Sequence, residues 1–222
     1  MSAIAADSAA LVRRSSARRA AGIARIVAGL ALLGTMTAQV TDRVMNNAFD
    51  PSEYFSYFTI ESCLIAIVVL LVGGAMALRY PSDTVLYTAV RASVLAYAIV
   101  TAGVYNGMLR YVPYEGYVGL TWPNEVMHVW VPLFILLDWL LSPGRAALPW
   151  RALGTVILFP LAWLAYTLVR GAITDIYPYP FLDPATGGVL SVTIYIVGLS
   201  LFILAIGAAS IAFSQAKARR RA

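Results

Sequence analysis

The sequence predicts an all-α membrane protein, a bundle of six transmembrane helices with both termini in the cytoplasm. Of its 222 residues, 60% are hydrophobic and only 12% are charged, whereas a soluble domain carries about 25% charged residues. Six spans of about 20 apolar residues require about 120 such residues, and the chain holds that many with enough left for short loops. The composition therefore excludes an ordinary soluble enzyme and leaves room for a single membrane domain.

Long apolar runs, separated by Pro, Gly and charged residues, predict the individual spans. They lie near residues 22–42, 53–79, 84–111, 122–142, 150–170 and 188–214. The first run follows an Arg-rich segment as a signal peptide would, but it is longer than a typical signal core and polar residues follow it instead of a cleavage pattern. The chain then divides into a basic N-terminal tail (1–21), a six-helix transmembrane domain (22–214) and a basic C-terminal tail (215–222).

Basic residues predict the orientation of the bundle. Most of them lie near the two termini, at the end of the second span, or between the fourth and fifth spans. They are Arg13, Arg14, Arg18, Arg19, Arg25, Arg79, Arg145, Arg151, Lys217, Arg219, Arg220 and Arg221. The alternate loops carry only Arg43, Arg110 and Arg170. The positive-inside rule places the larger set in the cytoplasm. The net charge of +5 then reflects orientation and contact with anionic lipids, not nucleic-acid binding, and we expect a multi-pass protein of a cell membrane, the inner membrane in a bacterium.

The loops on the opposite side are acidic and rich in aromatic residues and proline. Their acids are Asp42, Asp50, Glu53, Glu115, Asp175 and Asp183, and their aromatic segments are 49–51, 111–114 and 177–181. An interfacial aromatic belt explains these segments, and a substrate lid is the alternative. The chain has no internal repeat, so an inverted-repeat transporter receives no support.

Few residues are available for chemistry, because the chain has one cysteine and one histidine, Cys63 and His128. An intrachain disulfide, a Cys-rich zinc site and His-pair haem ligation are all excluded. A metal site would need carboxylates such as Glu61 and Glu125. We therefore expect no metal and no cofactor.

Polar residues at the start of the second span include Thr59, about 9 Å in from Glu53 at 1.5 Å per residue. Ser62 shares the helical face of Thr59, and Glu61 points away from it. A threonine in a membrane helix ordinarily bonds to its own helix or to a neighbouring one. The second span alone does not decide between this structural role and catalysis.

The fourth span places His128 at a similar depth, about 6 Å below its start at Pro123. Asn124 lies at i−4 on the same face, and Glu125 lies in the first turn. Pro132 leaves the His128 carbonyl without its helical donor. An ionisable residue within a span is a functional candidate, although a neutral imidazole satisfied by Asn124, a Tyr hydroxyl or water is an equal alternative. Thr59 and His128 are expected to meet across a helix interface.

Two further sets of polar residues lie on the third span. Arg91 is expected to form a buried ion pair with Asp138 of the fourth span, with snorkelling of Arg91 to the headgroups as the alternative. Tyr105, Asn106 and Arg110 are candidates to line the same outer pocket as His128, with anchoring at the membrane interface as an equal alternative for Arg110 and Tyr111.

Two stretches resemble the androgen-induced-protein family, which comprises multi-pass intramembrane threonine hydrolases that cleave branched fatty acid esters of hydroxy fatty acids. They are Tyr57-Phe58-Thr59 and Asn124-Glu125-Val126-Met127-His128, the latter followed by Phe134-Ile135-Leu136-Leu137-Asp138. The resemblance implies that Thr59 and His128 are the functional pair. For a bacterial relative it implies an acyl ester as the substrate, without fixing which one.

The expected function is therefore hydrolysis of a lipid or fatty-acyl ester, with Thr59 as the nucleophile and His128 as its base near the outer leaflet. Asn124 is expected to orient the ring, with Glu125 nearby, and Ser62, Asn106 or a Tyr hydroxyl to stabilise the oxyanion. Membrane lipids are the expected partners, and the oligomeric state stays open. The alternatives are a non-catalytic lipid-binding protein, a small-molecule transporter using the same pocket, and a structural membrane component.

Overall fold

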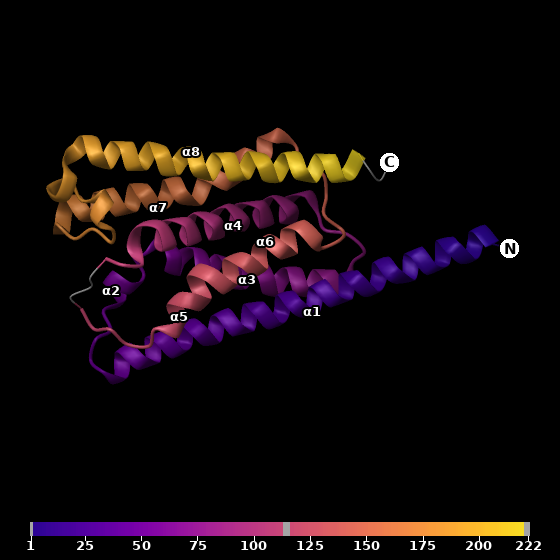
Figure 1. The fold of residues 1–222 in the computed structure, drawn as a ribbon, viewed down its shortest axis with the longest axis horizontal. Coiled ribbons are helices and arrows are strands. Elements are labelled where there is room, and N and C mark those ends of the chain that lie inside the picture. Colours follow the sequence, from indigo (N-terminus) through magenta and orange to yellow (C-terminus); the bar gives the residue numbers. More distant parts are fainter. Residues whose placement is uncertain (1, 113–115, 220–222) are drawn as a thin grey trace.

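The computed structural model describes residues 2–112 and 116–219, with side chains from residue 16 onward. Within these ranges the chain is helical and has no strand, and six helices are long and apolar enough to cross a membrane. They are Ser16–Met45, Phe58–Arg79, Val85–Leu109, Trp122–Leu141, Trp150–Thr174 and Pro184–Arg219. The predicted all-α polytopic bundle is confirmed (Figure 1). The side chains of Arg13 and Arg14, and the residues Glu115, Arg220 and Arg221, lie outside the described part.

The helices are α1 (Ser2–Met45), α2 (Pro51–Tyr54), α3 (Phe58–Arg79), α4 (Val85–Val104), α5 (Trp122–Glu125), α6 (Val131–Leu141), α7 (Leu153–Thr174) and α8 (Pro184–Arg219). A π-helical turn, Tyr105–Leu109, continues α4, and a second one, Val126–Trp130, joins α5 to α6. Short 3-10 turns at Trp150–Ala152 and Pro180–Leu182 precede α7 and α8. Both termini lie at one end of the bundle in Figure 1, and we call the opposite end, which carries α2 and α5, the distal end.

The second span begins later than the sequence predicts. Asp50 caps the separate helix α2 by accepting hydrogen bonds from the backbone N–H groups of Ser52 and Glu53, and Tyr57 is extended, with φ −75° and ψ 130°. The predicted start of a continuous helix at residue 53 is therefore wrong, and α3 starts at Phe58. As a result Thr59 is in the first turn of α3, at the distal end.

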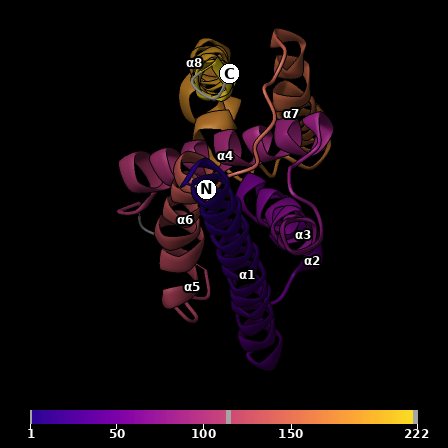
Figure 2. The ribbon, with the colours of Figure 1, turned by 90° about the vertical axis from the view of Figure 1, so that its right-hand side faces the viewer.

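Small residues bring α1 and α3 close together. A Cβ added to Gly74 of α3 would lie 2.5 Å from the side chain of Ile26 and 2.7 Å from the carbonyl oxygen of Gly22, both on α1. Such small-residue contacts allow membrane helices to pack without a hydrophobic driving force between them. Helices α7 and α8 lie together on the other side of α4 (Figures 1 and 2).

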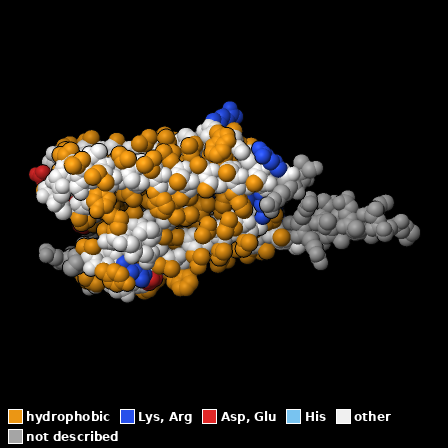
Figure 3. Space-filling view, turned by 45° about the horizontal axis from the view of Figure 1, so that its top comes forward, with side chains coloured by type: hydrophobic (Ala, Val, Ile, Leu, Met, Phe, Trp, Pro, Cys, Tyr) orange, Lys and Arg blue, Asp and Glu red, His pale blue; other side chains and the backbone are white. Residues whose placement is uncertain are grey.

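The outer surface is suited to lipid. In Figure 3 hydrophobic side chains are spread over the whole visible face, and few charged side chains appear on it. Large apolar side chains on α7 and α8, such as Leu158, Ile173 and Leu190, are more than two-thirds exposed. An exposed apolar belt of this extent is expected where acyl chains of a bilayer are the solvent.

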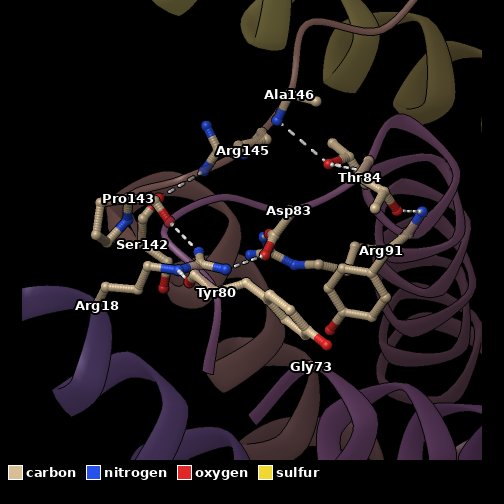
Figure 4. A network of polar contacts seen from close by, with 12 residues as sticks. Arg18, Gly73, Tyr80, Asp83, Thr84, Arg91, Ser142, Pro143, Arg145 and Ala146 are labelled. Atoms are coloured by element: carbon tan, nitrogen blue, oxygen red, sulfur yellow. Dashed lines mark hydrogen bonds and ion pairs between the residues drawn. The ribbon is translucent and has the colours of Figure 1, made fainter. Parts of the chain in front are cut away.

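A buried charge network joins α1, α4 and α6 near the end that carries the termini. Asp83 lies between Arg18 and Arg91 (Figure 4), at 2.8 and 2.7 Å. Asp138 is 2.7 Å from Arg91 and 2.9 Å from Arg25. The Arg91–Asp138 ion pair expected from the sequence is thus one link in a chain of five charges.

This network corrects the interpretation of two basic residues. Arg18 and Arg25 were expected to lie in the cytoplasmic tail or beside the headgroups, but they are only 4% and 1% exposed. The first span begins before residue 22, so both guanidinium groups are inside the bundle, where they need anionic partners. Arg91 is equally buried, at 5% exposed, and so does not snorkel to the headgroups.

Candidate functional site

Thr59 and His128, predicted to meet, are in contact at the distal end of the bundle. Thr59 Oγ1 lies 3.3 Å from His128 Nε2, within the range of a long hydrogen bond. Both side chains are buried, at 9% and 7% exposed. The two residues are 69 positions apart in the chain, so the pairing is set by tertiary packing.

The hydrogen bond at His128 Nδ1 determines which ring nitrogen carries the proton. Nδ1 is 2.8 Å from the backbone carbonyl oxygen of Asn124. A carbonyl oxygen only accepts, so Nδ1 carries the proton of the neutral imidazole, and Nε2 presents its lone pair to Thr59. Asn124 thus orients the ring, as expected, and does so through its main-chain carbonyl.

Two residues of the π-helical turn after α4 hold His128 in place. The ring of Tyr105 stacks on the imidazole, with centroids 3.8 Å apart and planes at 16°. Asn106 Nδ2 donates to the carbonyl oxygen of His128 at 3.2 Å, the carbonyl that Pro132 leaves without its usual donor. Asn106 therefore supports the backbone under His128, and the expected donation from its amide to an oxyanion is not supported. π-Helical turns are frequent at functional sites, and here they carry both stacked rings.

The other predicted supporting residues have different partners. Ser62 Oγ donates to the backbone carbonyl of Thr59 at 3.1 Å, so its proton is directed at the helix. Glu125 forms an ion pair with Arg110, in which the guanidinium donates a hydrogen bond to the carboxylate. This hydrogen bond raises the pKa of the Arg110 guanidinium. The Glu125 carboxylate is therefore engaged at the surface, and no acidic third member acts through Nδ1.

The pair opens into a cavity of about 570 Å³, a volume within the range of about 300–1,000 Å³ typical of small-molecule sites. One part of the lining is polar and comes from the distal ends of α1, α2 and α5, with Gln39, Asp42, Arg43, Asp50, Glu53 and Asn124. Another part is apolar and comes from α4, α7 and α8, with Val100, Val104, Pro160, Trp163, Ile196, Leu199 and Ile203. Thr59 and His128 line the same cavity.

The segment 177–181 covers Thr59, a position that the sequence did not predict. Tyr179 is only 8% exposed, and its ring packs 5.7 Å from Tyr57 and 6.0 Å from Trp163. Its hydroxyl faces the Thr59 side chain and the backbone N–H groups of Phe58 and Thr59. The interpretation of this segment as an interfacial belt does not hold for Tyr179, which is part of the cavity wall.

The site contains no candidate metal centre among the described residues, since no three His, Cys, Asp or Glu side chains lie close enough together to hold an ion. Comparison of the chain with protein-family models, curated proteins and solved structures gives no match.

Proposed function

We propose that the protein is an integral membrane ester hydrolase in which Thr59 is the nucleophile and His128 the general base. The observation that carries the proposal is the 3.3 Å contact between Thr59 Oγ1 and His128 Nε2, in the tautomer that leaves Nε2 able to accept a proton. A hydroxyl is a weak nucleophile at neutral pH unless an adjacent base removes its proton. The resemblance to the androgen-induced-protein family agrees with this assignment.

The reaction proceeds in two acyl transfers. His128 Nε2 takes the proton of Thr59 as Oγ1 attacks the ester carbonyl carbon. The tetrahedral intermediate collapses, the bond to the alcohol oxygen breaks, and the protonated imidazole gives its proton to that oxygen. A water molecule, deprotonated by His128, then attacks the acyl-threonine and releases the carboxylic acid, and Thr59 regains its proton.

The two-part lining of the cavity supports a lipid or fatty-acyl ester as the substrate. The apolar wall between α4, α7 and α8 suits an acyl chain, and the polar wall suits a headgroup or alcohol portion. The site lies at the end of the bundle opposite the basic tails, so the positive-inside rule places it in the outer leaflet of a cell membrane, the inner membrane in a bacterium. A lipid ester would then reach Thr59 from the bilayer and water from the outer aqueous side.

A non-catalytic lipid-binding protein is the second candidate, because the volume and apolar wall of the cavity suit lipid binding without chemistry. Transport is less well supported. A transporter needs polar lining on both sides of the midplane, whereas the pocket beside Arg91 and Asp138 has a volume of only about 10 Å³.

The test is hydrolysis of a panel of lipid and chromogenic acyl esters by purified protein, with Thr59→Ala and His128→Ala beside the wild type. Thr35→Ala is the matched control, because Thr35 is equally buried but its hydroxyl bonds to the Ala31 carbonyl of its own helix. We expect Thr59→Ala to abolish turnover, and His128→Ala to lower it by about 10²–10⁴-fold or more, with the control active. Folded wild-type protein that hydrolyses no ester would favour lipid binding instead.

A further inference from the structure

The N-terminus of α3 presents backbone donors beside Thr59. The first N–H groups of a helix have no acceptor within it, and Tyr57, at the N-cap position of this 22-residue helix, makes no side-chain hydrogen bond to them. Thr59 is the second residue of α3, so its own N–H is one of these groups. The helix dipole adds partial positive charge at the same place, which favours a developing negative charge there.

Tyr179 adds a side-chain hydroxyl at this position from another part of the fold. The ring packs against Tyr57 and Trp163 and stacks on Phe181, with the centroids of the stacked rings 5.2 Å apart. The hydroxyl lies against the Thr59 side chain, and its oxygen accepts hydrogen bonds from the N–H groups of Phe58 and Thr59. Burial raises the pKa of Tyr179 to about 12, so the hydroxyl keeps its proton at neutral pH and is able to donate it in a hydrogen bond.

The surroundings hold this hydroxyl in place before any ligand arrives. Trp163 Nε1 donates to the carbonyl oxygen of Ser56 at 3.0 Å, which joins α7 to the segment just before α3. The Tyr177 ring packs so closely on Gly171 that a Cβ there would lie 2.1 Å from it, and Pro178 and Pro180 restrict the backbone on both sides of Tyr179. Preorganised donors of this kind are the ones that lower an activation barrier.

We propose that the Tyr179 hydroxyl, whose oxygen is held by the N–H groups at the start of α3, is the oxyanion donor of the ester hydrolysis. The inference rests on the proposed function. As Thr59 Oγ1 bonds to the carbonyl carbon, the electron pair of the C=O π bond moves to the carbonyl oxygen, and this oxygen accepts a hydrogen bond from the Tyr179 hydroxyl. The Tyr179 hydroxyl keeps its proton throughout. When the C=O double bond re-forms, the bond to the alcohol oxygen breaks and His128 supplies the proton.

The test compares Tyr179→Phe with Tyr195→Phe, which removes a hydroxyl from a ring of the same aromatic cluster, 5.3 Å from Phe181. Loss of one oxyanion donor lowers kcat by about 10²–10³-fold, so we expect this loss in Tyr179→Phe with little change in KM, and near-normal kcat in the control. A Tyr179→Phe variant as active as the wild type would overturn the oxyanion assignment alone. Wild-type protein without turnover would overturn both the assignment and the proposed function.

A substrate change tests the same claim without depending on the folding of the variant. A thionoester places sulfur, a weaker hydrogen-bond acceptor, where the carbonyl oxygen would be. We expect the wild type to prefer the oxygen ester over the thionoester by more than hydroxide does in solution, and Tyr179→Phe to lose much of this preference. A wild-type preference no larger than that of hydroxide would contradict an oxyanion hole at this site.

Discussion

Replacement of Asp138 by Asn should destabilise the protein strongly without disabling the site. The Asp138 carboxylate accepts hydrogen bonds from Arg91, Arg25 and Ser142, and its side chain is only 9% exposed. The network holds three guanidinium groups and two carboxylates. Asp138→Asn removes one of the two negative charges, so Asp83 becomes the one anion of the network for three buried cations. Removing one partner of a buried ion pair costs about 3–5 kcal/mol. At about 2–4 °C per kcal/mol for a chain of this size, the midpoint of thermal unfolding should fall by about 6–20 °C.

The lone cysteine supplies the assay for this prediction. Cys63 is only 5% exposed, so a thiol-reactive dye labels it when the bundle opens, and labelling during heating reports unfolding. Glu61→Gln is the control, since it makes the same carboxylate-to-amide change at a partly exposed position. Because Asp138 is ten residues from His128, about 15 Å along a helix, ester turnover at low temperature should persist. An Asp138→Asn midpoint within a degree or two of the control would refute the reasoning.

Three further outcomes are expected. Tyr105→Leu should lower kcat/KM about two- to tenfold, because the stacked ring contributes about 0.5–1.5 kcal/mol to holding the imidazole; steady-state kinetics checks this. Gly74→Val should cost about 1–3 kcal/mol, because its side chain would overlap Ile26 of α1; Cys63 labelling should show a lower unfolding midpoint. Hydrogen bonds from Ser52 lower the pKa of Asp50 below its ordinary 3.8, so the cap stabilises the fold above pH 3.8 and is lost as pH falls through the lowered value. The difference in midpoint between wild type and Asp50→Ala should therefore shrink on acidification.

The sequence was sufficient for the spans and for the central pair. Six apolar runs separated by Pro, Gly and charge identify six spans, because a bilayer requires continuous apolar helices of a fixed length. Thr59 and His128 could be paired because each lies near the start of a helix running in the same direction, and residues at one depth can meet across an interface. The lost donor at Pro132 also indicated that the His128 carbonyl needs another partner, which the structure supplies from Asn106.

The remaining features depend on tertiary packing that a single sequence does not reveal. Arg18 and Arg25 have the composition of a cytoplasmic flank, and only the packing of α1 against α6 and the start of α4 shows them to be buried partners of Asp83 and Asp138. Tyr179 lies in a Tyr- and Pro-rich loop of the kind found at any membrane interface. Its place over Thr59 follows from how α7 and α8 pack on α4, which the local pattern does not specify.

The identity of the nucleophile is tested most directly by trapping it. Purified protein would be treated with a long-chain fluorophosphonate, digested and analysed by mass spectrometry to locate the phosphonyl group. The account predicts a single adduct on Thr59, formed by the wild type and by Thr35→Ala but not by His128→Ala. An adduct on another residue, or ester turnover that persists in Thr59→Ala, would contradict it.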